Sequence, residues 1–117
     1  MAVAQEQVSI EHVQQQLASA KAYTLVFLTQ GKVKDDAKAA QNQMPHLQYL
    51  FSLKEGGHVS IFGPLTDNSN IRGILIFNVT DIGQVKKLMD GDPHVKAGHL
   101  SYEIHPWFGV PGQTLGH

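Results

Sequence analysis

Two segments of the sequence are apolar on both faces when drawn as extended strands, and this pattern limits the possible folds more than any other. Residues 23–29 place Tyr23, Leu25 and Phe27 on one face and Val26 and Leu28 on the other. Residues 71–79 place Ile71, Leu75, Phe77 and Val79 on one face and Ile74 and Ile76 on the other. A strand with one face in water alternates apolar with polar side chains. The two segments are therefore predicted to be central strands of a sheet that is covered on both faces.

The remaining segments give the order strand, helix, strand, strand, helix, strand. Further strands are predicted over residues 58–63 and 100–106. One helix ends at Gly56, and a second begins after Asp81, with Gln84 in the capping-box position. This order is typical of the ferredoxin-like α+β fold, a four-stranded antiparallel sheet with two helices on one face. Since one chain has helices for only one face, we expect a second subunit to bury the other face in a homodimer.

An additional helix is predicted before the first strand. Ser9 is a good N-cap, and Ile10, Val13 and Leu17 form one narrow apolar stripe, so the helix is expected to pack on a formed structure or on a partner chain. After Phe108 the chain has glycines, a proline and no periodicity, and this tail is expected to be mobile unless a partner holds it. The chain thus divides into an N-terminal helical extension (1–21), an α+β domain (22–108) and a C-terminal tail (109–117).

The start of the helix that ends at Gly56 is less simple, because Pro45 lies within the pattern. Asp35 or Asp36 could cap one long helix, but an internal proline costs about 3 kcal/mol. Asn42 as the cap would place Pro45 in the first turn, where its missing N–H matters less. We favour two segments, with a kink or break near Pro45.

Composition excludes several classes of protein. Nine basic and ten acidic side chains give a net charge of −1, without the basic excess that nucleic-acid binding requires. No apolar run approaches the roughly 20 residues that span a bilayer, so no membrane partner is expected. The first residues have no apolar signal-peptide core, which makes the cytoplasm the expected location. Phosphate-binding loops, nucleophile elbows and dinucleotide fingerprints do not occur, and no cofactor is predicted.

A polar rim follows the strand over residues 58–63. Pro64 cannot donate to a strand ladder, so pairing should end there, and a ligand could approach closely over Gly63. Asp67 is either a turn former or an acid, and Arg72 is either a solvated surface residue or a partner for a substrate carboxylate. Gly63, Pro64, Asp67 and Arg72 are therefore the candidate substrate-binding residues.

Four short motifs occur in order along the chain: Pro45 to Leu50, Gly63-Pro64-Leu65 with Asp67 beyond it, Asp92-Pro93 followed by Ala97-Gly98, and Glu103 to Trp107. Together they resemble the YCII-related domain family, over about residues 22–108. The resemblance implies a dimeric α+β barrel with a pocket between helix and sheet in each subunit. It also implies a His–acid pair, which by the matching motifs is His46 and Asp92. This sequence departs from the family pattern in its N-terminal helix, in residues 35–43 and in Pro45 directly before the histidine.

Each candidate catalytic residue also has a structural explanation. His46 borders the predicted core stripe of Leu47, Leu50 and Phe51, where it could be a packed histidine or a general base. Asp92 could cap a short turn over residues 93–96, or turn toward His46. The chain has seven histidines, but the spacing of His94, His99 and His105 fits no standard zinc pattern, and no metal site is predicted.

Two classes of function remain. The first is a small cofactor-free enzyme, isomerase-like, lyase-like or dehalogenase-like, in which His46 transfers a proton at carbon of an aromatic or carbonyl compound. The second is a dimeric ligand-binding or accessory module without turnover. The two classes differ in whether His46 and Asp92 meet in a water-accessible pocket.

Overall fold

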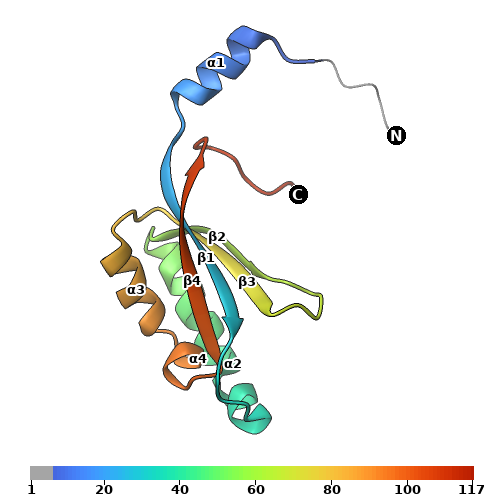
Figure 1. Ribbon diagram of the computed structural model, residues 1–117, viewed down its shortest axis with the longest axis vertical. Coiled ribbons are helices and arrows are strands. Elements are labelled where there is room, and N and C mark those ends of the chain that lie inside the picture. The colour runs from blue at the N-terminus through green and yellow to red at the C-terminus, as the bar shows by residue number, and fades with distance from the viewer. Residues whose placement is uncertain (1–6) are drawn as a thin grey trace.

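A four-stranded antiparallel sheet in the order β2–β3–β1–β4 forms the frame of the chain (Figure 1). The computed structural model describes residues 7–117. The strands are β1 (Lys21–Gln30), β2 (Val59–Pro64), β3 (Ile71–Phe77) and β4 (Leu100–Gly109). The helices are α1 (Ile10–Ala18), α2 (Asp36–Glu55), α3 (Ile82–Asp90) and α4 (Pro93–Lys96). The predicted ferredoxin-like α+β fold is confirmed. Among the described helices, none is long and apolar enough to cross a membrane.

The two central strands are β1 and β3, as the two-faced apolar pattern predicts. On one face Val26 pairs with Leu75, both fully buried, and these strands share a core with buried residues of α2 and α3. On the opposite face Leu25 pairs with Ile76 and Phe27 with Ile74, and these four side chains are only half-buried. The residual exposure of the second face means that the sheet is fully covered on one side only.

Helix α1 projects from the far end of the β1–β4 ribbon, away from the other helices (Figure 1). Ser9 caps it by accepting a hydrogen bond from the His12 amide at 3.1 Å. No residue of α1 is buried, and Ile10 and Leu17 are 76% and 63% exposed. The radius of gyration is 17.0 Å, against about 13 Å for a compact domain of this length. Within residues 7–117 the helix therefore does not pack on a formed structure, and that expectation is wrong. Packing on a partner chain stays a prediction.

Deletion of residues 1–19 is expected to leave the stability of the α+β domain almost unchanged. Because α1 buries no side chain, its removal exposes no core, and the free energy of unfolding should change by less than about 0.5 kcal/mol. Urea denaturation at low protein concentration measures this, with Leu53→Ala as a core control that should cost about 2–5 kcal/mol. A loss on deletion comparable to that of Leu53→Ala would show that α1 packs on the domain.

Helix α2 is one continuous helix from Asp36 to Glu55, so the favoured break near Pro45 is wrong. The cap is Asp35, whose carboxylate accepts from the Lys38 amide at 3.1 Å, and not Asn42. Pro45 removes the amide that would bond to the Gln41 carbonyl, and its ring crowds that carbonyl, but Gln41 is exposed, so water can bond to the carbonyl instead. Burial of side chains after the proline offsets the remaining cost.

The buried stripe of α2 differs from the predicted one by part of a turn. His46, Leu50 and Leu53 are buried, at the spacing of one helix face, whereas Phe51 is 56% exposed. The Phe51 ring lies instead at the helix border, with its centroid 4.9 Å from that of Phe62. The shift places His46 on the buried face of the helix, and not only at its border.

Candidate active site

His46 and Asp92 are in direct contact inside the protein. Nδ1 of His46, on α2, lies 2.8 Å and 2.9 Å from the two carboxylate oxygens of Asp92, which precedes α4. The residues are 7% and 0% exposed. Because a carboxylate only accepts, Nδ1 carries the hydrogen, and Nε2 is the ring nitrogen without a proton in the neutral form. The structure thus brings together the two residues that the sequence singles out.

Asp92 performs both of the tasks that the sequence leaves open. Besides its contact with His46, its Oδ1 accepts from the His94 amide at 3.2 Å and so caps α4. Pro93 occupies the first helical position, where no amide is needed. The cap fixes the carboxylate on the backbone of α4, and this placement directs it at α2.

Tyr49 and Gly91 hold the segment before Asp92 against α2. The Tyr49 hydroxyl donates to the Leu88 carbonyl at 2.8 Å. A Cβ atom at position 91 would overlap that hydroxyl, so any larger residue there would displace the Tyr49 side chain. Burial, and then the nearby Asp92 charge, raise the pKa of Tyr49. The hydroxyl therefore remains a donor at neutral pH.

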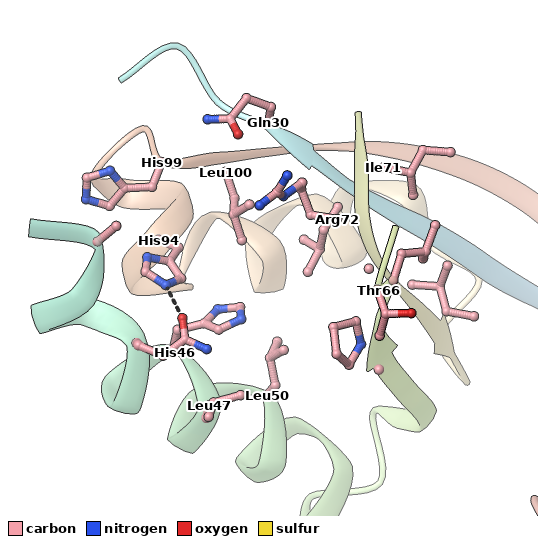
Figure 2. Close-up of a pocket in the computed structure, with 18 of the residues that line it drawn as sticks. Gln30, His46, Leu47, Leu50, Thr66, Ile71, Arg72, His94, His99 and Leu100 are labelled. Atoms are coloured by element: carbon pink, nitrogen blue, oxygen red, sulfur yellow. Dashed lines mark hydrogen bonds between the residues drawn. The ribbon is translucent and has the colours of Figure 1, made fainter. Parts of the chain in front are cut away.

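A cavity of about 680 Å³ opens beside this pair, between α2 and the end of the sheet (Figure 2). His46, Leu47 and Leu50 of α2 line one wall. Leu28 and Gly73 of the sheet lie among the residues opposite. Nε2 of His46 makes no hydrogen bond to the described residues, and it is the nitrogen available to a group in the cavity.

The four candidate substrate-binding residues of the rim, Gly63, Pro64, Asp67 and Arg72, all line the same cavity. Pro64 ends β2 as expected, and the next amide, that of Leu65, donates to the Arg72 carbonyl at 2.9 Å. Asp67 accepts from the Ser69 amide at 3.2 Å, a turn-forming bond that lowers the pKa of its carboxyl group. Arg72 is exposed and forms no ion pair with the described residues, which leaves its guanidinium available (Figure 2).

Among the polar residues of the cavity wall that sequence reasoning missed, Gln43, His94 and His99 form a group beside His46. The His94 ring packs against that of His46, tilted by 42° with centroids 4.6 Å apart, and the His99 ring lies 5.5 Å from that of His94. Nε2 of His94 contacts Oε1 of Gln43 at 2.9 Å. The spacing of these histidines in the sequence bears only on a zinc site, and no cluster suited to a metal occurs among residues 7–117. His94 directly follows Pro93 and therefore lies beside the Asp92 cap. This position is the feature of the sequence that could have identified it.

Stability should fall as the pH drops below about 6.5, the ordinary pKa of histidine. Burial, and then the proximity of His46, lower the pKa of His94 in the folded chain, against the opposing effect of Asp92. In this range the unfolded chain binds a proton that folded His94 does not, so acid favours unfolding. Urea denaturation at pH 7.5 and 5.5 should show a smaller difference for His94→Phe than for the wild type. His12→Phe, on exposed α1, is the control. An unchanged pH dependence in His94→Phe would contradict the assignment.

Comparison with known proteins agrees with this architecture. Residues 11–108 match the family model of the YCII-related domain. The chain belongs to the YCII-related family. Among solved structures, this YCII-related chain is similar to the 5-chloro-2-hydroxyhydroquinone dehydrochlorinase TftG from Burkholderia phenoliruptrix AC1100, in complex with 2,5-dihydroxybenzoquinone. The TM-score is 0.55 at 23% identity, covering 72% of this chain and 92% of that chain. Among curated proteins no match was found.

Proposed function

We propose that this protein is a cofactor-free small-molecule enzyme in which the His46–Asp92 pair transfers a proton at carbon of an aromatic or carbonyl compound. The observation that carries the proposal is a buried histidine–carboxylate contact of 2.8 Å in the wall of a cavity of about 680 Å³. A histidine oriented by a carboxylate is a common general base, since the carboxylate fixes the tautomer and stabilises the imidazolium.

In the proposed reaction, Nε2 of His46 takes a proton from a saturated carbon next to a carbonyl group, such as the one in the keto tautomer of a hydroxylated ring. The electron pair of the broken C–H bond moves into an enolate, and Asp92 stabilises the charge on His46. The proton then returns to another atom in an isomerisation, or a leaving group departs as an anion in an elimination. Arg72 and Lys34 line the cavity and are suited to stabilise the enolate oxygen.

The ligand class we propose is a planar hydroxylated or quinoid ring. The similar structure is a dehydrochlorinase in complex with 2,5-dihydroxybenzoquinone, and elimination of chloride belongs to the same class of proton-transfer reactions. At 23% identity that likeness shows a shared fold only. The proposed ligand class is therefore supported by the residues that line the cavity of this chain, His46 with Arg72 and Lys34. Gly63, Pro64, Asp67 and Arg72 are the proposed substrate contacts of the rim.

We also propose that the protein is a homodimer, joined through the open face of the sheet as in a dimeric α+β barrel. The half-buried Leu25, Phe27, Ile74 and Ile76 on that face support this arrangement. Light scattering across a dilution series should give twice the chain mass of 12.8 kDa. Ile76→Lys should dissociate or unfold the dimer, because a buried charge needs a partner. A stable monomer at all concentrations would contradict the proposal.

The test of the proposed function uses 2,5-dihydroxybenzoquinone as a probe in two steps. Isothermal titration calorimetry measures binding, which Arg72→Met should weaken. NMR in D₂O then measures deuterium incorporation at the ring C–H positions. This exchange requires deuteration of a ring carbon to give the keto tautomer, followed by removal of the original proton from that saturated carbon, and the enzyme should accelerate it above the rate in buffer. Binding without acceleration would favour the second candidate, a ligand-binding module without turnover. The absence of binding would contradict the proposed ligand class.

A further inference from the structure

Two buried histidines of the cavity have no part in the mechanism described above. His94 and His99 are 5% and 7% exposed, and three of their four ring nitrogens have no hydrogen-bond partner among the described residues. A phenylalanine or leucine at either position would avoid this desolvation cost. The one ring nitrogen that does have a partner, Nε2 of His94, therefore suggests what the ring does.

Gln43 selects one chemical form of His94. Its Oε1 lies 2.9 Å from Nε2 of His94, and because an amide oxygen only accepts, Nε2 must carry the hydrogen. Nδ1 is then the unprotonated nitrogen, and it is closed off without a partner. Charging the ring would place an unsatisfied N–H at that buried position, which is unfavourable. The neighbouring His46 also lowers the pKa of His94, which favours the neutral form. His94 is therefore a neutral ring near neutral pH.

This neutral ring lies on His46. The centroids are 4.6 Å apart and the planes are inclined by 42°. The backbone of His94 is tied to the same carboxylate, since its amide donates to Asp92 at 3.2 Å. His46 is thus held at one ring edge by Asp92, and its ring packs at a tilt against that of His94. A charged His94 ring would repel the imidazolium that forms when His46 takes a proton, whereas a neutral ring does not.

We propose that His94 is a positioning residue for His46: Gln43 fixes its neutral Nε2–H form, and its ring holds the plane of the His46 ring so that Nε2 of His46 stays available to the cavity. The inference rests on the proposed role of His46 as the base. The other charged residues that line the cavity form no hydrogen bond to the His94 ring among the described residues: Lys34, Asp35, Asp36, Asp67 and Arg72. Gln43 is the side chain that controls the form of His94.

The test reads the tautomers of both rings by ¹⁵N NMR of the whole protein, with thermal melting to confirm folding. The wild type should show a single Nδ1–H form of His46 and a single Nε2–H form of His94. Gln43→Met removes the acceptor from an exposed part of α2, and it should replace the single form of His94 by a mixture of forms. Because the released His94 ring can then turn, the signals of His46, whose Nδ1–H form Asp92 still fixes, should broaden. His94→Leu should broaden the His46 signals in the same way, whereas His94→Phe supplies a neutral ring that needs no hydrogen bond and should restore the wild-type signal.

A double variant makes the test specific to the Gln43–His94 contact. If Gln43 acts through His94, Gln43→Met should have no effect on His46 in the His94→Phe background. An equal effect in that background, or a wild-type His46 signal in Gln43→Met and His94→Leu, would overturn the proposal. If the probe shows accelerated exchange, Gln43→Met should lower that rate about 10-fold, as partners that orient a metal-bound histidine do. The NMR result does not depend on that exchange, so failure of the proposed function and failure of this inference remain distinguishable.

Discussion

Asp92→Ala is expected to lower the free energy of unfolding by about 2–4 kcal/mol, because it leaves a buried His46 donor without its acceptor, at about 1–3 kcal/mol, and removes a helix N-cap worth about 1 kcal/mol. The carboxylate is fully buried, contacts Nδ1 of His46 at 2.8 Å and caps α4 through the His94 amide. Its removal leaves the His46 ring nitrogen and the first turn of α4 without their acceptor. Urea denaturation of the variant and the wild type at pH 7 measures the difference.

Asp81→Ala is the matched control. Asp81 caps α3 in the same way, accepting from the Gly83 amide at 3.0 Å, but it is exposed and has no histidine partner. Loss of an N-cap alone costs about 1 kcal/mol. The difference between the two variants therefore isolates the contact with His46. If Asp92→Ala cost no more than Asp81→Ala, Asp92 would be a helix cap only, and the pair would not contribute to stability.

His46→Asn is expected to reduce proton exchange of a bound probe by about 10²–10⁴-fold, the usual contribution of a positioned general base. The asparagine amide can reach the position of Nδ1 and donate to Asp92, but it has no counterpart of Nε2. The variant therefore removes the proposed base and keeps the buried hydrogen bond. Deuterium incorporation into 2,5-dihydroxybenzoquinone, corrected for binding by calorimetry, measures the effect.

The control for this variant is His105→Asn. His105 also contacts a carboxylate, that of Glu103 at 3.3 Å, but both side chains are about half exposed, at 48% and 57%. This pair is outside the residues that line the cavity, and its loss should leave the exchange rate unchanged. An equal loss of activity in both variants, or full activity in His46→Asn, would exclude His46 as the base.

The parts of the fold that the sequence predicts well are those with local periodicity. The two-faced apolar pattern of residues 23–29 and 71–79 identifies the central strands, and Ser9 and Asp81 mark helix starts by local capping. Pro45 misled the prediction of α2, because proline propensity is local whereas the burial of Leu50 and Leu53 depends on the whole fold. Phe51 was assigned to the core for a related reason, since hydrophobicity alone does not fix the orientation of a helix face.

The candidate site was predictable only in part. His46 and Asp92 stand out through their motifs, but the sequence left open whether Asp92 caps a helix or meets the histidine, and the structure has it doing both. The contact of His94 with Gln43 joins residues 51 positions apart. No local pattern encodes such a contact, because it depends on how α4 docks beside α2.

Pro45 has one more consequence, for access to the cavity. It divides α2 into a second half anchored by buried His46, Leu50 and Leu53, and a first half, residues 36–44, without a buried side chain. The first half contributes Asp36, Ala39 and Gln43 to the cavity wall. The missing backbone hydrogen bond at the proline makes this the point where the helix bends most easily. Bending there would change the cavity wall and would also move Gln43, whose Oε1 contacts Nε2 of His94, so admission of a larger ligand would release the ring that packs against His46.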